Sequence, residues 1–598
     1  MKNVTSVPKC FNLLLLHLLV ALPGVGRAGN SSASGATPVR VVDIREFNSD
    51  ERLSAVCLQG LANRYEARVY LNTGPSVQWM QFGFDDRKNG AWSQAAAEEL
   101  KGRYASICDA WIDMLTRRGL YRFETVPILH LLESQRPAIS GVILYEKLDD
   151  DLAVAATMAG LRAALPMTPK VYEAWGRPLG LPVVFDVRSL YGQYDPKEER
   201  RLGAHRWAFE HLFPDCRKNG ALSRDRTYGL DAHDTLIDVD LAVANRWITY
   251  DLSYLSEETK NPNDRPHPQF GFDMPDTPIV KTILAGLEPF SPVYGWGRPD
   301  ENNLVRRLTL AGMVKICTGT ANSSFYKHLP RMTPSSAPPA KERPRPSLEE
   351  KVYLAFMVNE GDTLKYLASL GNLGAWLQPE RGKTPINWGM DPLMYREFPG
   401  LVSYFQATAT ENDHFFSATS GWGYTHPERL ADQQVEPYAR LVREGGQRSG
   451  LEYIDFWWIR GLQPRKAFYP FIQATGMRGV TLWSDDQRVE YAPDAPPIVH
   501  SDHYYTLSDP AAFAEQLIRD SEGVRRPWFV AVYGAKPTGT PYKFYEVARR
   551  LPADRFKVVG LEEFFAAARD ARPQVEGRHF KRSGDKPLPP GAGQAPVP

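Results

Sequence analysis

Apolar and polar positions in the carboxyl-terminal half of the chain follow a regular strand–helix rhythm. Short apolar runs, which predict buried strands, are separated by stretches with helical spacing such as 363–377, 427–443, 510–521 and 541–551. The predicted strands are 352–358, 385–388, 413–419, 453–458, 479–483, 497–499, 528–533 and 556–559. About eight such units within 350–572 are typical of a (β/α) barrel, and a doubly wound sheet is the alternative.

The amino-terminal half also alternates, less regularly. Predicted strands at 39–44, 67–71, 140–145 and 182–187 are interleaved with helices at 51–64 and 150–164, and 200–220 and 235–258 are expected to be mainly helical. This pattern predicts an α/β region over 38–329, as one unit or two subdomains. A Pro-rich segment at 330–349 predicts a linker, and the basic Pro/Gly-rich end at 573–598 predicts a disordered tail.

The first 28 residues have the pattern of a secretory signal peptide. Lys2 and Lys9 precede an apolar run at 11–22, and small residues at Gly26 and Ala28 suit cleavage. The run is too short to span a bilayer stably. We therefore expect a protein that is secreted or periplasmic, with no membrane association after signal removal.

Charge and cysteine content narrow the function classes. The formal net charge of the 598 residues is +1, with no basic stripe, so the sequence predicts no nucleic-acid partner. The mature chain keeps Cys57, Cys108, Cys216 and Cys317 at long spacings, which allows one or two disulfides and disfavours a zinc–thiolate site. No cofactor and no metal are predicted.

A glycine-rich turn stands between the predicted strand 413–419 and the helix that follows it. Gly421 and Gly423 allow backbone angles closed to other residues, and Pro427 is placed at the first helical position. Trp422, Tyr424 and His426 lie on this turn. In α/β folds a turn at the carboxyl end of a strand is where ligands bind. Burial of these aromatic residues as packing is the competing interpretation.

Carboxylates and aromatic residues recur at the other predicted strand ends. Glycosidic bond cleavage needs one carboxyl group as acid and a second as nucleophile or base, in a cleft that aromatic rings can line. The catalytic candidates are Glu360, Asp362, Asp485 and Asp486. The substrate-binding candidates are Trp388, Trp422, Tyr424, His426, Trp458, Trp483 and Asp502.

A metal site is the alternative chemistry at these strand ends. His500 and His503, with Asp485 or Asp362, offer ligands that suit zinc, which would indicate a metal-dependent polysaccharide deacetylase. On an extended segment the two histidines would diverge, so this interpretation ranks below hydrolysis by a carboxylate pair.

The segment 421–427 resembles the signature of the GxGYxYP family of glycoside hydrolases. Gly421, Gly423, Tyr424 and Pro427 match, and His426 stands where the family has Tyr. The segments 359–363 and 386–392 resemble flanking family segments, with Asp362 retained and Glu360 in place of an Asp. In the first half, 58–63 and 295–296 are similar to the family's amino-terminal domain.

The resemblance implies an α/β amino-terminal region before a barrel-like domain, and a glycosidase activity on carbohydrate. The expectation is an exported hydrolase that uses Asp362 with Asp485 or Asp486. A non-catalytic glycan-binding protein on the same scaffold is the other alternative.

Overall fold

The computed structural model describes most of the chain beyond residue 37. The described residues are 38–76, 92–196, 200–224, 236, 238–251, 278–296, 301–332, 347–358, 361, 363–371, 373–456, 468–483, 488–501, 509–534 and 539–578, without the side chains of 301–303, 483 and 501. The predicted signal peptide and most of the predicted linker and tail lie outside these ranges. No helix in the described ranges is long and apolar enough to cross a bilayer.

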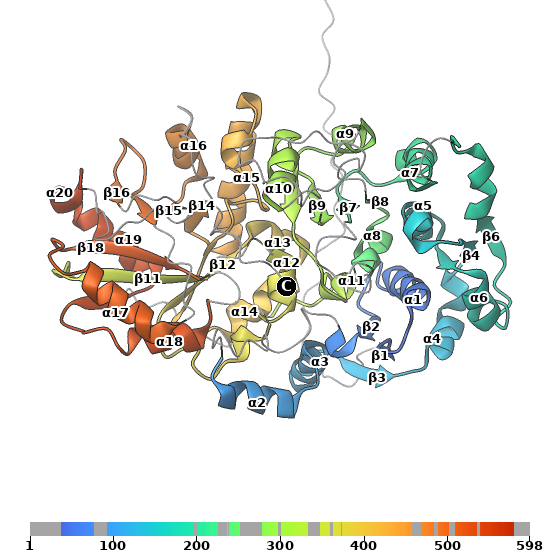
Figure 1. The fold of residues 1–598 in the computed structure, drawn as a ribbon, viewed down its shortest axis with the longest axis horizontal. Helices are drawn as coiled ribbons and strands as arrows, with labels where there is room; N and C mark the ends of the chain where they lie inside the picture. Colours follow the sequence, from blue (N-terminus) through green and yellow to red (C-terminus); the bar gives the residue numbers. More distant parts are fainter. Residues whose placement is uncertain are drawn as a thin grey trace, which may run out of the picture. The chain divides into compact units, whose positions relative to one another are not determined.

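Three small parallel sheets make up the first half (Figure 1). Their strand orders are β2-β1-β3, β5-β4-β6 and β10-β9-β7-β8. The strands are β1 (Pro38–Asp43), β2 (Val69–Asn72), β3 (Arg122–Thr125), β4 (Gly141–Leu144), β5 (Ala164–Met167), β6 (Val183–Asp186), β7 (Ala221–Ser223), β8 (Ile248–Tyr250), β9 (Pro292–Gly295) and β10 (Val314–Ile316). The helices are α1 (Ser49–Ala62), α2 (Gln94–Arg103), α3 (Ile107–Arg117), α4 (Ile128–Gln135), α5 (Leu148–Arg162), α6 (Pro169–Val171), α7 (Arg200–His211), α8 (Val239–Asn245), α9 (Pro278–Ala285), α10 (Glu301–Leu310) and α11 (Ser323–Tyr326).

The second half is built on one nine-stranded sheet that curls into a nearly closed barrel. Eight of its strands follow the order β16-β17-β15-β14-β13-β12-β11-β18, and the ninth, β19, pairs with β11. The strand β17 also contacts β18. Among the described residues, all strand pairings in this sheet are parallel except that of β16 with β17. The strands are β11 (Val352–Val358), β12 (Ile386–Met390), β13 (Asp413–Ser417), β14 (Tyr453–Phe456), β15 (Gly479–Trp483), β16 (Arg488–Glu490), β17 (Ile498–Ser501), β18 (Trp528–Tyr533) and β19 (Phe556–Val558). The helices are α12 (Thr363–Ala368), α13 (Pro392–Glu397), α14 (Pro399–Thr408), α15 (Asp432–Ser449), α16 (Phe468–Thr475), α17 (Pro510–Asp520), α18 (Pro541–Ala548), α19 (Leu561–Asp570) and α20 (Arg572–Val575).

The two faces of the barrel strands enter different apolar clusters. Along β11, Leu354 and Phe356 join the main core with residues of the surrounding helices, whereas Tyr353 and Ala355 join a second cluster. Side chains alternate across a strand, so the second cluster marks the inner face. Phe564 and Phe565 of α19 belong to this inner cluster.

Helix α19 fills the amino-terminal end of the barrel. Phe565 stacks on Tyr453, the first residue of β14, at 5.4 Å between ring centroids, and Phe564 packs edge-on against Phe529 near the start of β18 at 5.6 Å. Because α19 occupies this end, inward side chains near the carboxyl ends of the strands are the ones placed to meet a ligand.

The eight strands predicted in this half are all present, and the expected barrel-like α/β fold is confirmed. The sheet departs from an ideal barrel at β11, whose edge pairs with β19 over its first half and with β12 over its last two residues. Asn387 joins these strands, because its amide donates to the Phe356 carbonyl and accepts the N–H of Leu561. The antiparallel strand β16 is an addition that the pattern did not predict.

Three element predictions are wrong in detail. The helix expected from Pro427 begins at Asp432, after a 3₁₀ turn at Pro427–Arg429, and continues to Ser449. The region 235–258, expected to be mainly helical, contains the strand β8 after the short helix α8. The first residues of the predicted tail belong to α20, where Val575 is buried.

The domain division stays a prediction. Contacts join the chain from residue 37 onward into one compact unit. The main core contains buried side chains from both sides of the predicted linker, from Val39 to Phe556. Cys57, Cys108, Cys216 and Cys317 are all buried free thiols.

Candidate functional site at the carboxyl ends of the barrel strands

The turn after β13 has an unusual backbone. Ser420, Gly421 and Gly423 have φ values of 67°, 110° and 68°, in the left-handed region. A Cβ on Gly421 would lie 2.6 Å from Cγ2 of Val442, and one on Gly423 would lie 2.6 Å from Cβ of Val314. Glycine is therefore required at both positions for two reasons, because the backbone angle and the close packing each disfavour a side chain.

Tyr438 on α15 holds this turn closed through its hydroxyl group. The oxygen accepts the N–H of Trp422 at 3.1 Å and lies 2.5 Å from Oγ1 of Thr425. The hydroxyl donates to the Ser420 carbonyl at 2.9 Å. Burial raises the pKa of Tyr438 far above its usual value, so the hydroxyl stays neutral and can donate.

Asp391 holds the turn from the neighbouring strand end. It follows β12 and caps α13, and its Oδ1 accepts the N–H of Leu393 at 2.8 Å and the N–H of Gly423 at 3.0 Å. The residue is 3% exposed, and its Oδ2 has no hydrogen-bond partner among the described residues. Burial raises the pKa of this carboxyl to about 7, although both backbone N–H groups favour the charged form.

The same turn is paired with the amino-terminal region. The backbone N–H of Lys315 on β10 donates to the Tyr424 carbonyl at 3.1 Å, and the N–H of Tyr424 donates back to the Lys315 carbonyl at 2.9 Å. The N–H of His426 donates to Oγ1 of Thr309 on α10 at 3.2 Å. The turn is thus fixed on both sides, by the barrel and by the β7–β10 sheet.

An aromatic and positively charged group lies beside the turn. The ammonium groups of Lys315 and Lys365 lie 4.9 Å and 4.8 Å from the ring centroid of Trp296, which follows β9. Trp296 and Tyr424 belong to a small apolar cluster separate from the main core. The Tyr424 ring lies so close to Gly361 that a Cβ there would be 2.7 Å from Cε1 of the ring.

Asp455 supplies a carboxylate on the inner face of the barrel. Its neighbours Ile454 and Phe456 lie in the main core on the outer face, and Tyr453 lies in the inner cluster, so alternation places Asp455 inward. Oγ1 of Thr481 on β15 donates to its Oδ1. The Asp455 carbonyl accepts the N–H of Ser420 at 2.9 Å, which ties this strand directly to the glycine-rich turn.

Most of the catalytic and substrate-binding candidates from the sequence lie outside the described residues. These are Glu360, Asp362, Trp458, Asp485, Asp486 and Asp502. Trp483 ends β15, but its side chain is not described. Their roles stay predictions, and the flanking residues Gly361 and Thr363 show where the chain passes on each side of Asp362.

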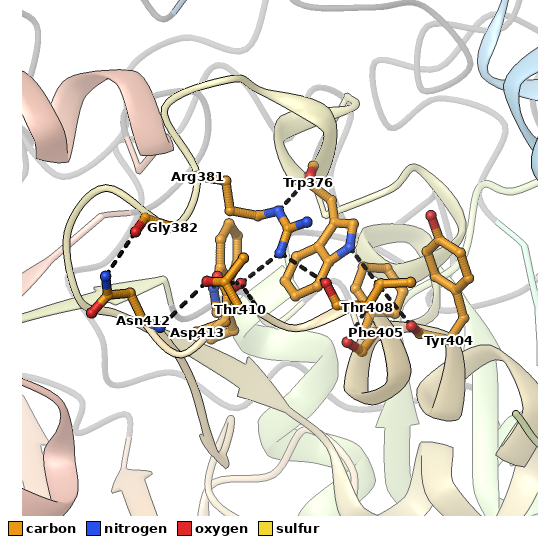
Figure 2. A network of polar contacts seen from close by, with 10 residues as sticks. Trp376, Arg381, Gly382, Tyr404, Phe405, Thr408, Thr410, Asn412 and Asp413 are labelled. Atoms are coloured by element: carbon orange, nitrogen blue, oxygen red, sulfur yellow. Dashed lines mark hydrogen bonds and ion pairs between the residues drawn. The ribbon is translucent and has the colours of Figure 1, made fainter. Parts of the chain in front are cut away.

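Trp388 differs from the expectation of a sugar platform. Its side chain has no exposed surface, and its indole N–H donates to Oδ1 of Asp413 at 2.8 Å. Figure 2 shows the polar network around Asp413, in which Oδ2 accepts from the Arg381 guanidinium at 2.5 Å and from Thr410 at 2.8 Å. Asp413 begins β13, away from the strand's carboxyl end, so Trp388 packs the barrel wall and offers no ring face to a sugar.

The three residues on the turn are also buried. Tyr424 is 0% and His426 1% exposed, and Trp422 packs against Gly445 beneath the Arg396 guanidinium, 4.8 Å from its ring. The competing interpretation, that the aromatic residues of the turn are buried as packing, therefore fits Trp422. Tyr424 and His426 line the junction with the β7–β10 sheet, and His426 Nδ1 lies 3.8 Å from Oε1 of Glu428.

The metal alternative gains no support from the described residues. Nε2 of His500 is hydrogen-bonded to Oε2 of Glu490 on β16 at 2.8 Å. Within the described ranges, no three His, Cys, Asp or Glu side chains are grouped to hold a metal ion. His503 lies outside those ranges.

Asp391 and Asp455 are the site residues that the sequence interpretation missed. An Asp directly before Pro392 is a typical helix start, and it identifies a capping residue at a strand end. Asp455 interrupts an apolar strand at a position that alternation assigns to the inner face. Both signals are visible in the sequence, but they gain meaning only once the strand ends are assembled.

The barrel region matches a known family. Residues 350–569 match the family model described as GxGYxYP putative glycoside hydrolase C-terminal domain, which confirms the predicted resemblance over this region. No curated protein matches the chain in sequence.

The chain is similar in fold to solved structures. One is a putative hydrolase from Bacteroides thetaiotaomicron VPI-5482, with 16% identity, a TM-score of 0.69 and coverage of 90% of this chain and 95% of that chain. At this identity the likeness shows the fold alone. The peptidoglycan deacetylase PdaC from Bacillus subtilis is also matched, at 10% identity, 38% of this chain and 96% of that chain, with a TM-score of 0.23 that supports no argument.

Proposed function

We propose, from the family match over residues 350–569, that this protein is an exported glycoside hydrolase whose chemistry takes place at the carboxyl end of the barrel. The observation that carries the proposal is Asp455, an inward carboxylate bound to the glycine-rich turn through its own backbone. The signal-peptide pattern of residues 1–28 supports export.

Asp455 suits the role of nucleophile or base. A hydroxyl donor stabilises the ionised form of a carboxylate, and Thr481 provides such a donor. Glycosidic bond cleavage then needs a second carboxyl group that protonates the leaving oxygen. Asp362, Asp485 and Asp486 are the candidates for that acid, as the sequence predicts.

A glycoside screen with paired variants tests this proposal. The mature protein, Asp455→Asn and Asp362→Asn are assayed on chromogenic glycosides and on polysaccharides, with Asp509→Asn as control because Asp509 is an exposed cap of α17. We expect each of the first two changes to lower kcat/KM by about 10²-fold or more, and the control to retain activity.

Three outcomes would contradict parts of the proposal. Full activity in Asp455→Asn would remove Asp455 from the mechanism. Glycan binding without turnover in the unaltered protein would favour the non-catalytic alternative. Release of acetate from an acetylated glycan, lost on adding a chelator, would favour the metal-dependent deacetylase.

A further inference from the structure

Asp391 joins two segments of the site through a single oxygen atom. Its Oδ1 accepts one N–H from the start of α13 and one from Gly423, in the turn after the next strand. The N–H of Gly423 has no helix or strand partner, so this side chain replaces the backbone pairing that a tight turn lacks. A change at Asp391 therefore acts directly on the position of Gly423.

The position of Gly423 in turn affects residues next to the proposed site. Gly423 precedes Tyr424, whose backbone pairs in both directions with Lys315 on β10. The ring of Tyr424 packs on Gly361, the residue before the catalytic candidate Asp362. The Asp391 carboxyl is thus connected to Gly361, beside the predicted acid, through the hydrogen bond to Gly423, the Gly423–Tyr424 peptide and the packing of the Tyr424 ring.

The second carboxyl oxygen makes this link sensitive to protonation. Oδ2 is buried and has no hydrogen-bond partner in the described part of the chain, so the ionised form carries charge that no described donor satisfies. The titratable and charged groups that act on Asp391 are Arg396 on its own helix, Tyr438 on α15 and Tyr294 on β9. Burial raises the pKa of both tyrosines well above the usual value, so both stay neutral.

Arg396 does not hydrogen-bond to Asp391. Its guanidinium is about half exposed, lies over Trp422 and donates to Glu397. An ionised Asp391 gains by drawing in water or by turning toward Arg396, and either movement competes with the bond to Gly423.

We propose that Asp391 is a positioning residue that fixes the Gly423–Tyr424 backbone, and that the turn is held tightly while its carboxyl is protonated and loosens when it ionises. The relevance for catalysis depends on the glycosidase function proposed above, but the positioning itself does not. Because burial raises the pKa from 3.8 to about 7, the loosening develops between about pH 4 and 7 and is complete above that range.

Hydrogen exchange of the peptide that covers residues 419–426 tests the proposal without an activity assay. Exchange is measured between pH 5.5 and 8.5 by mass spectrometry, corrected for the intrinsic pH dependence of exchange, on the full mature chain. The variants are Asp391→Asn, whose amide oxygen keeps the acceptor and cannot ionise, and Asp391→Ala, which removes it. Asp509→Ala is the matched control, since Asp509 also caps a barrel helix, and among the described residues its side chain accepts hydrogen bonds only from Ala511 and Ala512 of that helix.

We expect protection of this peptide in the unaltered protein to fall as pH rises toward about 7 and to level off above it, and to stay constant in Asp391→Asn. Asp391→Ala should exchange about tenfold faster at every pH, and Asp509→Ala should match the unaltered protein within about twofold. Identical pH dependence in the unaltered protein and Asp391→Asn would overturn the proposal, even if Asp391→Ala fails to fold. So would unchanged protection in Asp391→Ala.

An activity profile separates this proposal from the proposed function. If a cleaved glycoside is found, the kcat/KM of the unaltered protein should decrease as pH rises near 7, and that of Asp391→Asn should not. The decrease should come from kcat more than from KM. A failed glycoside screen with the expected exchange data would reject the hydrolase function and leave the positioning role intact.

Discussion

The indole N–H of Trp388 donates to Asp413 at 2.8 Å, and this bond lies inside the barrel wall at the start of β13. Trp388, which the sequence places at a strand end, is therefore a packing residue. The distinction matters for function, because a tryptophan that binds sugar must expose one ring face, whereas Trp388 exposes none.

Trp388→Phe should therefore lower stability and leave glycan binding unchanged. The change removes the hydrogen bond to buried Asp413, and the free energy of unfolding should fall by about 1–3 kcal/mol. Urea unfolding and glycan affinity are the two measurements. Trp376→Phe is the matched control, because Trp376 is also buried and donates its indole N–H to Thr408. Loss of glycan affinity at unchanged stability would restore Trp388 as a sugar platform.

Gly423→Ala should destabilise the protein strongly. The new Cβ would combine a φ of 68° with a contact of 2.6 Å to Val314. Gly450→Ala isolates the first effect, since Gly450 has a φ of 71° and nothing within 4 Å of its Cβ position. We expect about 1–2 kcal/mol for Gly450→Ala and about 1–3 kcal/mol more for Gly423→Ala by thermal unfolding. An equal loss of unfolding free energy in both variants would mean that the Val314 side chain moves aside without an energetic cost.

Tyr438→Phe should loosen the glycine-rich turn. The missing hydroxyl leaves the N–H of Trp422 and the carbonyl of Ser420 without this partner, at a cost of about 2–3 kcal/mol in the free energy of unfolding. Tyr404→Phe is the control, because among the described residues the buried Tyr404 hydroxyl donates only to the weak acceptor Sδ of Met114. A loss in Tyr404→Phe as large as that in Tyr438→Phe would show that the turn network adds nothing.

Asp391→Asn should become more stable relative to the unaltered protein as pH rises. The folded carboxyl has a pKa of about 7 against a usual 3.8, so the folded state binds the proton more tightly and its stability falls between about pH 4 and 7. The Asn variant lacks this loss. The difference in the free energy of unfolding should grow over that range to at most about 4 kcal/mol and remain constant above it.

Urea unfolding at several pH values measures this difference, with Asp509→Asn as the control for an exposed capping aspartate. A difference that does not change with pH would show that Asp391 ionises as readily in the folded as in the unfolded chain.

The sequence predicted the barrel well because its signals are local. The strands β11, β15 and β18 were predicted at their observed bounds, since each is a continuous apolar run between polar segments. It predicted less well where structure depends on neighbours far along the chain. The strand β8 lies within 235–258, a region expected to be mainly helical. Its three residues favour a strand, but so short a run is recognisable only through its pairing with β7.

The sequence by itself determined the order of strands and helices, the position of the glycine-rich turn and the family match. Those features depend on apolar periodicity and on the left-handed backbone that glycine permits at 421 and 423. Only the tertiary structure decided what each side chain near the turn does. Trp388 and Trp422 proved to be packed, and Asp391 and Asp455 came to the turn, because strand register and helix packing set burial and direction between residues distant in sequence.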